Sequence, residues 1–86
     1  MRAKKKQIQP RSGPERAFGE VLRSNRRKSR LSQEKLAFES GLDRTTVSLL
    51  ERGLISPSLR TMVRVGRVLQ LSLSELGRQI EASRFL

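Results

Sequence analysis

Side chains that can donate and accept hydrogen bonds are concentrated between residues 31 and 53 of this chain. The stretch reads LSQEKLAFESGLDRTTVSLLERG, and it places Ser, Gln, Asp, Arg and Thr at the expected starts and outer faces of helices. Only a thin apolar stripe runs between these polar residues. Polar groups in this arrangement suit the recognition of another molecule through hydrogen bonds.

The side chains that most enzymes use for chemistry are missing. The 86 residues include no cysteine and no histidine, which removes disulfides, thiolate nucleophiles, the usual zinc sites and imidazole acid–base catalysis together. We also find no nucleophile–base pair and no phosphate-binding loop. The sequence therefore predicts a protein that is not an enzyme and that has no metal or cofactor.

The charge of the chain points to an anionic partner. Lysine and arginine number 19 against 8 aspartate and glutamate residues, a formal net charge of +11 that attracts polyanions. Nucleic acid is the first candidate, and an anionic membrane surface is the second. No apolar run approaches the roughly 20 residues that span a bilayer, and the amino terminus lacks the apolar core of a secretory signal. We expect a cytoplasmic protein.

The amino-terminal residues 1–14 differ in composition from the rest. They contain no acidic residue, two prolines and one glycine, and they hold five basic residues, Arg2, Lys4, Lys5, Lys6 and Arg11. A segment of this kind cannot bury itself and is expected to be a disordered basic arm. Two interpretations stay open: the arm contacts phosphates or a minor groove, or it is only a solvated tail.

Residues 15–86 form the expected folded domain, because their apolar positions follow a helical period and no alternating run predicts a strand. Ser32, Asp43 and Ser58 stand at expected helix starts, and Gly41 can end a helix in the left-handed conformation. Gly66 offers room for the approach of another helix. Helices are expected at about residues 14–28, 33–40, 44–52 and 59–69, and a fifth begins at the capping box Ser72-x-x-Glu75.

The predicted core takes mainly apolar residues from every helix and from one turn, together with the polar Asn25, and Phe38 is not assigned to either face. The expected inward residues are Ala17, Phe18, Val21, Leu22, Asn25, Leu36, Ala37, Leu42, Val47, Leu50, Leu59, Met62, Val63, Val65, Leu69, Leu73 and Leu76.

The central stretch, preceded by FGEVLRSNRR and followed by SPSLRTMVRVGRVLQLSLSEL, resembles the helix-turn-helix domain of the phage Cro and repressor proteins and their bacterial (XRE-like) relatives. The resemblance covers roughly residues 17–77. It implies an all-α, lambda-repressor-like bundle of five helices. It also implies a sequence-specific transcriptional regulator of double-stranded DNA, with the helix at about 44–52 in the major groove.

The resemblance further implies roles for individual residues. Base contacts are expected from Arg44, Thr45, Ser48 and Leu49, and backbone contacts from Ser32, Gln33, Thr46 and Arg52. The alternative for Arg44 is a surface charge that balances Asp43 or Glu39. Arg26 and Glu51 are expected to form a largely desolvated structural ion pair.

The carboxyl-terminal residues Ile80, Phe85 and Leu86 exceed what the core of five short helices needs, and they are candidates for a homodimer contact. A two-fold dimer would place two recognition helices about 34 Å apart on an inverted-repeat operator. We expect no ligand-sensing domain after Leu86.

Other roles stay open at this stage. The charge also suits a sequence-neutral nucleic-acid-binding protein, although three phenylalanines without tryptophan or tyrosine offer few stacking platforms. The same fold could serve as a protein-interaction module, as in an antitoxin with a toxin partner. A small autoregulator of the Cro kind and a restriction-modification controller fit equally well, and the operator and the sign of regulation are left open.

Overall fold

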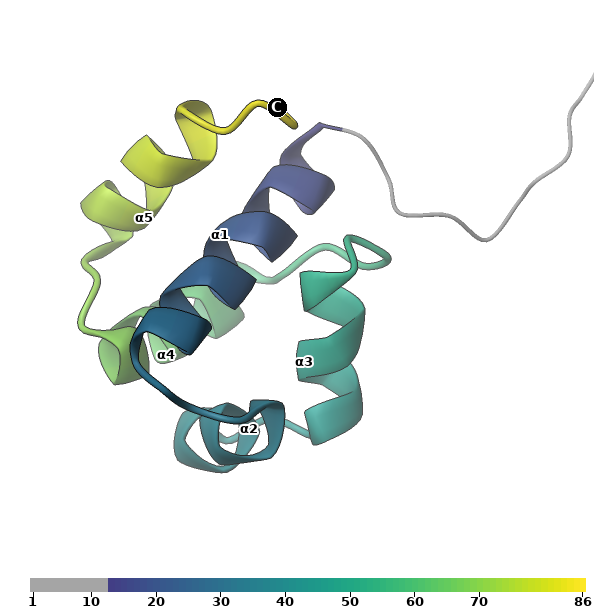
Figure 1. Cartoon of the computed structure of the whole chain (residues 1–86), viewed down its shortest axis with the longest axis vertical. Coiled ribbons are helices and arrows are strands. Elements are labelled where there is room, and N and C mark those ends of the chain that lie inside the picture. Colours follow the sequence, from purple (N-terminus) through teal and green to yellow (C-terminus); the bar gives the residue numbers. More distant parts are fainter. Residues whose placement is uncertain (1–12) are drawn as a thin grey trace, which may run out of the picture.

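The computed structural model describes residues 13–86, which form five helices and no strand (Figure 1). They are α1 (Pro14–Lys28), α2 (Gln33–Ser40), α3 (Arg44–Glu51), α4 (Leu59–Leu69) and α5 (Leu73–Glu81). The predicted all-α fold is confirmed. The third helix is one residue shorter than predicted, because Arg52 is its C-cap with φ −86° and ψ 0°.

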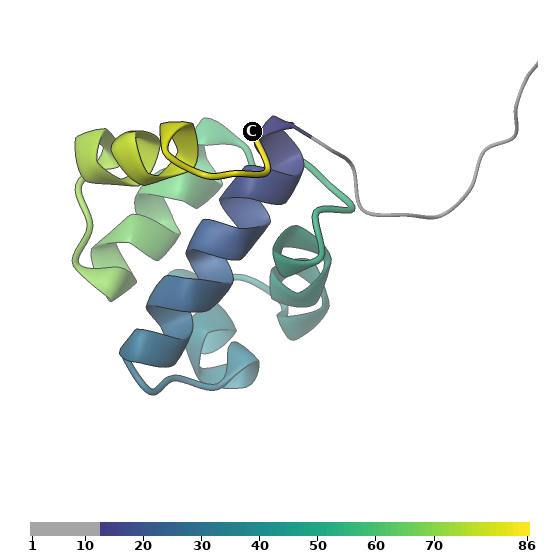
Figure 2. The same ribbon diagram turned by 45° about the horizontal axis from the view of Figure 1, so that its top comes forward.

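Helix α1 lies between α3 and α5. It packs against α3 on one side and α5 on the other, while α2 packs against both α3 and α4. Figure 2 shows α3 on one side of α1, with α4 and α5 on the other side. Only α4 and α5 make a further extensive contact. This arrangement anchors α3 on two neighbours, α1 and α2, and leaves its remaining surface open.

A small apolar core fills the space between the helices. Fully burying side chains of this size contributes about 1.5–3 kcal/mol each relative to exposure. The largest side chains that are almost wholly inaccessible are Phe18, Leu22, Leu36, Leu50, Leu76, Val47 and Val65. Every helix contributes to this set, so the burial that stabilises the domain also sets the positions of α2 and α3.

Three predictions about apolar or small residues were wrong. Leu59 and Leu73 were assigned to the core, but they are 62% and 45% exposed. Each lies in the first turn of its helix, on the side of the helix that faces solvent. Gly66 was assigned to a helix–helix approach. A Cβ atom there would instead lie 2.7 Å from the Leu71 carbonyl oxygen, in the chain that follows α4.

Serine hydroxyls cap three of the helices. Ser32, Ser58 and Ser72 each accept a hydrogen bond from the backbone N–H three residues later, at 3.0 Å. Asp43 occupies the N-cap of α3 with an extended backbone, but its carboxylate makes no capping bond. The capping box of α5 is also only half formed, since the Glu75 carboxylate accepts hydrogen bonds from Arg78 and Gln79.

The two ends of the described domain meet. The Gly13 N–H donates to the Phe85 carbonyl at 3.1 Å, and the Arg16 guanidinium lies 4.2 Å from the centre of the Phe85 ring. Gly13 and Pro14, the last two residues of the expected arm, are therefore part of the fold. The basic residues Arg2, Lys4, Lys5, Lys6 and Arg11 lie outside the described residues. Within residues 13–86 no helix is long and apolar enough to cross a membrane.

Candidate nucleic-acid interface

Helices α2 and α3 form a helix–turn–helix around Gly41. Gly41 has φ 72°, a left-handed conformation that costs glycine little, and the Leu42 N–H then donates to the Ala37 carbonyl at 2.8 Å. Leu42 packs against the core immediately after the turn. The turn therefore directs α3 across α2 and brings the amino end of α3 to the surface.

Helix α3 separates a buried face from an open face. Val47 and Leu50 are 0% and 1% exposed and fix the helix against the core. Arg44 and Thr45 are exposed at its amino end, and Ser48 and Leu49, one turn later, are half-buried. The four residues predicted to contact bases thus lie on one side of the helix, with the first two most accessible.

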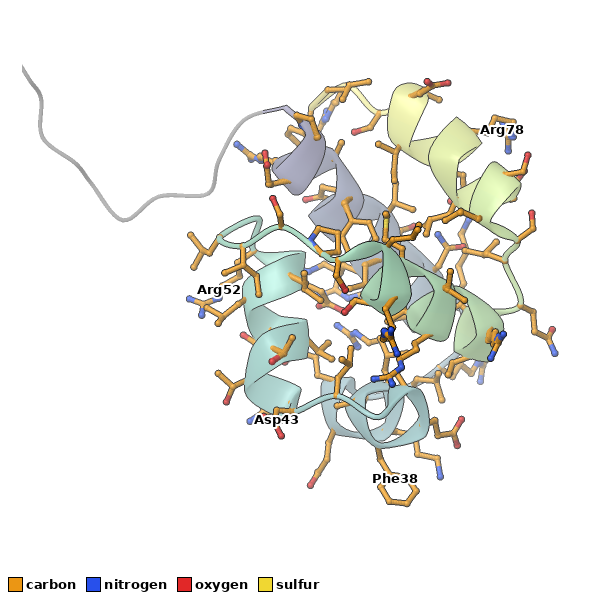
Figure 3. All side chains as sticks on the ribbon, turned by 180° about the vertical axis from the view of Figure 1, so that it is seen from behind. Phe38, Asp43, Arg52 and Arg78 are labelled. Atoms are coloured by element: carbon orange, nitrogen blue, oxygen red, sulfur yellow. The ribbon has the colours of Figure 1, made fainter. Side chains whose placement is uncertain are left out.

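Of the predicted backbone-contact residues, Ser32, Gln33 and Arg52 lie at the two ends of this unit, and Thr46 lies in the first turn of α3. Thr46 is half-buried, and Arg52 is exposed and projects outward beyond α3 in Figure 3. Ser32 and Gln33 begin α2, where the Ser32 hydroxyl accepts from the Lys35 N–H. None of these four side chains belongs to the apolar core.

The structure provides no acidic partner for Arg44 among residues 13–86. Glu39, one of the two carboxylates considered for this role, pairs with Lys35 at 3.3 Å. Asp43, the other, forms no ion pair in the described part of the chain. Arg44 is therefore not held in a surface ion pair with either residue.

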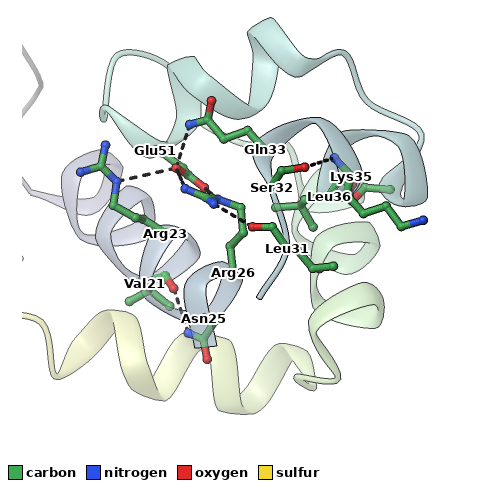
Figure 4. Close-up of polar contacts among 11 residues, drawn as sticks. Val21, Arg23, Asn25, Arg26, Leu31, Ser32, Gln33, Lys35, Leu36 and Glu51 are labelled. Atoms are coloured by element: carbon green, nitrogen blue, oxygen red, sulfur yellow. Dashed lines mark hydrogen bonds and ion pairs between the residues drawn. The ribbon is translucent and has the colours of Figure 1, made fainter. Parts of the chain in front are cut away.

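A buried carboxylate joins the first three helices. The Glu51 side chain is 0% exposed, and Arg26, 12% exposed, donates from Nε to Glu51 Oε2 at 2.6 Å and from Nη2 to Oε1 at 3.0 Å. Arg26 Nη1 also donates to the Leu31 carbonyl at 2.8 Å (Figure 4). The expected pair is present and bidentate, and it ties α1 to the end of α3 and to the chain that enters α2.

Two further polar side chains reach the same carboxylate. Gln33 donates from Nε2 to Glu51 Oε1 at 2.9 Å, and the Nε atom of Arg23 lies 3.6 Å from that oxygen. The predicted pair of Arg26 and Glu51 is therefore part of a cluster of four residues, the Glu51 cluster: Arg23, Arg26, Gln33 and Glu51. The sequence pattern had assigned no role in this pair to Arg23.

The cluster keeps Glu51 ionised. Burial alone would raise the pKa of Glu51, but hydrogen bonds from Arg26 and Gln33 and the positive charges of Arg26 and Arg23 hold it below its usual 4.5. The hydrogen bond to Glu51 is also the main reason that the pKa of Arg26 is raised. Both partners thus remain charged and paired at neutral pH.

Close packing between backbones supports the cluster. A Cβ atom on Gly19 of α1 would lie 2.5 Å from the Leu50 carbonyl oxygen and 2.7 Å from that of Glu51. Only glycine lets α1 approach the end of α3 this closely. Sequence reasoning missed Gly19, because a single glycine within a helical pattern does not reveal what lies opposite it.

The candidate dimer residues have different surroundings. Ile80 is partly buried against the core, and Phe85 is half-buried, with guanidinium groups of Arg16 and Arg84 at 4.2 and 4.9 Å from its ring centre. Leu86 is 53% exposed. The structure does not gather the three into one exposed patch. Among residues 13–86 no group of three carboxylate, histidine or cysteine side chains could hold a metal ion.

Known proteins are similar to the part of the chain that contains the helix–turn–helix. A family model described as Helix-turn-helix covers residues 22–76. Over 60 residues the chain is 42% identical to the control protein C.BamHI of Bacillus amyloliquefaciens. This alignment covers 69% of this chain and 74% of that protein.

Solved structures are similar over the same region. That of the restriction-modification controller protein C.AhdI from Aeromonas hydrophila is 43% identical with a TM-score of 0.68, over 71% of this chain and 92% of that chain. The master regulator for biofilm formation SinR, in complex with DNA, is 28% identical with a TM-score of 0.66, over 69% of this chain and 95% of that chain. The similarity thus extends to a helix–turn–helix that was solved on DNA.

Proposed function

Because this chain belongs to the helix-turn-helix family of the XRE-like, Cro and repressor type, we propose that it is a sequence-specific DNA-binding transcriptional regulator. The observation that carries the proposal is the open amino end of α3. Arg44 and Thr45 are exposed there, with no acidic partner for Arg44 among residues 13–86, on a helix whose other end the Glu51 cluster anchors. Binding DNA through this end places the polar side chains in the major groove and leaves the core undisturbed.

The proposed base contacts follow from the chemistry of the exposed side chains. The Arg44 guanidinium can donate two hydrogen bonds to O6 and N7 of guanine, worth about 1–3 kcal/mol of discrimination. Thr45 and Leu49 offer apolar contact to a thymine methyl group. Ser48, one turn further along α3, can donate to or accept from either kind of base.

The proposed backbone contacts set the register of α3 on the duplex. Ser32 and Gln33 at the start of α2, and Thr46 and Arg52 on α3 and its C-cap, would contact phosphates rather than bases. The amino-terminal arm would add phosphate contacts through four of its basic residues, Arg2, Lys4, Lys5 and Lys6.

We also propose that the protein binds an inverted repeat as a homodimer. Leu73 and Ile80 lie seven residues apart along α5, a spacing that places them on one side of the helix, and Leu86 follows it. Leu73 and Leu86 are exposed to solvent, whereas Ile80 is partly buried against the core. Phe85 is less suited to the contact than the sequence indicated, since Arg16 and Arg84 cover its ring.

The names of two relatives favour one of the biological roles that the sequence left open. C.BamHI is a control protein and C.AhdI is a restriction-modification controller by name. Of the roles that the sequence left open, a controller of a restriction–modification system is the one that these relatives favour.

Selection from a random duplex library tests the proposal. The full-length protein is incubated with the library at about physiological salt, and the bound pool is sequenced. Enrichment of an inverted repeat with half-sites about 10 base pairs apart is expected. Arg44→Ala should then lose preference at particular base pairs. Binding without enrichment would indicate a sequence-neutral protein, and no binding at all would favour a protein partner such as a toxin.

A further inference from the structure

The Glu51 cluster contains more positive charge than its carboxylate can neutralise. Glu51 Oε2 accepts from Arg26, and Oε1 already accepts from both Arg26 and Gln33. Arg23 Nε lies 3.6 Å from Oε1, too far for a good hydrogen bond, and this buried atom has no hydrogen-bond partner in the described part of the chain. One carboxylate pairs with one guanidinium, so the charge of Arg23 is left over.

The orientation of Gln33 follows from the same carboxylate. An ionised carboxylate can only accept hydrogen bonds, so the amide nitrogen of Gln33, and not its oxygen, must face Glu51. That nitrogen carries two hydrogens, and Glu51 takes one. The second N–H of Gln33 remains available to another acceptor.

Arg23 and Gln33 therefore flank one oxygen of Glu51 from different helices. Arg23 comes from the middle of α1 and Gln33 from the first position of α2. Figure 4 shows the terminal nitrogens of Arg23 turned away from Glu51. The Arg23 side chain is 37% exposed, which lets these nitrogens reach a ligand from solvent.

We propose that Arg23 and Gln33 together hold one phosphate group of the DNA backbone, and that Glu51 positions both side chains for it. This inference rests on the proposed DNA-binding function and adds Arg23 to its contacts. A phosphate carries several acceptor oxygens and suits the planar fork of an arginine. The Glu51 carboxylate, which anchors the end of α3, thereby also sets where the DNA backbone is held. One residue then fixes both how deeply α3 enters the major groove and its register along the duplex.

The test compares two variants that remove one positive charge each. Arg23→Gln removes the proposed contact, and Arg67→Gln removes an exposed arginine of α4, outside the cluster. Affinity of the full-length protein for DNA is measured between about 0.05 and 0.3 M salt. Each phosphate contact contributes about 0.9 to the slope of log K against log salt, so Arg23→Gln should lower that slope by about 0.9 and the affinity about fivefold near 0.15 M.

A conservative variant separates binding from architecture. Arg23→Lys keeps a charge that can pair with a phosphate, and it should retain most of the slope. Thermal unfolding of all three variants should stay close to that of the parent protein, because Arg26 retains both bonds to Glu51. An unchanged slope for Arg23→Gln, or an equal loss for Arg67→Gln, would overturn the proposal.

The DNA used in the titrations distinguishes this inference from the proposed function. Phosphate contacts form on any duplex, so the loss of slope should appear both on an enriched operator and on random-sequence DNA. Absence of operator enrichment with the slope loss intact would refute sequence-specific regulation and leave the phosphate site standing. Operator enrichment with no slope loss would refute the phosphate site alone.

Discussion

Two helical glycines are predicted to respond in opposite ways to the same substitution. Alanine is favoured over glycine in a helix interior by about 0.8–1 kcal/mol, so Gly→Ala would stabilise either helix if nothing else intervened. Apart from the adjacent residues and the backbone of α5 itself, no atom of residues 13–86 lies within 4 Å of the position that a Cβ atom would take at Gly77 in α5. At Gly19 in α1 the same atom would meet two backbone oxygens, at 2.5 and 2.7 Å.

The magnitude follows from how far the backbone must move. Ordinary contacts begin at 3.4 Å, so the Leu50 carbonyl would have to retreat by about 1 Å from the added methyl group, and the end of α3 would move with it. Overpacking of this kind costs about 1–3 kcal/mol, and the shift would also lengthen the bonds between Arg26 and Glu51. After the gain in helix propensity is subtracted from the overpacking cost, we expect Gly19→Ala to lower the free energy of unfolding by up to about 2 kcal/mol and Gly77→Ala to raise it by about 0.5–1 kcal/mol.

Circular dichroism during thermal and urea unfolding provides the measurement. In a domain of this size a change of 1 kcal/mol moves the Tm by about 4–8 °C, so the two variants should differ clearly and in sign. Two protein concentrations are needed, because dimerisation would raise the apparent stability. If Gly19→Ala were as stabilising as Gly77→Ala, the close approach of α1 to the end of α3 would be refuted.

Three other predictions concern the cluster and the dimer. Arg26→Ala leaves the buried Glu51 carboxylate with only the Gln33 hydrogen bond and Arg23 at 3.6 Å, and it should lower the free energy of unfolding by about 3 kcal/mol in urea titrations. A loss below about 1 kcal/mol would mean that the pair is effectively exposed. Because the pKa of Glu51 is lowered on folding, its contribution should be complete above pH 4.5 and decrease as pH falls below that value, and Glu51→Gln should show a flatter decrease in acid titrations of stability. Leu73→Glu should shift the protein from dimer to monomer in sedimentation experiments with its circular dichroism spectrum retained, and an unchanged dimer would place the contact elsewhere.

The helices were predictable because local signals agreed. Serines at three N-caps, Gly41 after α2 and the apolar period together placed nearly every boundary, and the one-residue error at the end of α3 falls within ordinary fraying. The pair of Arg26 and Glu51 came from the resemblance rather than from the period. Without that resemblance, residues 25 positions apart would not have been connected.

The remaining features depend on three-dimensional neighbours that a sequence pattern does not contain. A periodic apolar residue such as Leu73 is buried only if another element covers the first turn of its helix, and none of the described elements does. Asp43 has the residue type of a cap, but its carboxylate takes no capping bond. Arg23 and Gly19 gained their roles from the end of α3, which lies far from them in sequence.

Helix α1 begins where the chain that follows α5 closes on it. The Gly13 N–H bonds to the Phe85 carbonyl, and the Phe85 ring carries the Arg16 guanidinium, so the first turn of α1 and the segment after α5 share their stabilising contacts. Separating either one releases the other, and the two ends should therefore open as one cooperative unit in hydrogen exchange. The first turn of α1 and the segment after α5 should therefore open together and not fray separately. Exchange of the Gly13 amide hydrogen would report this shared opening.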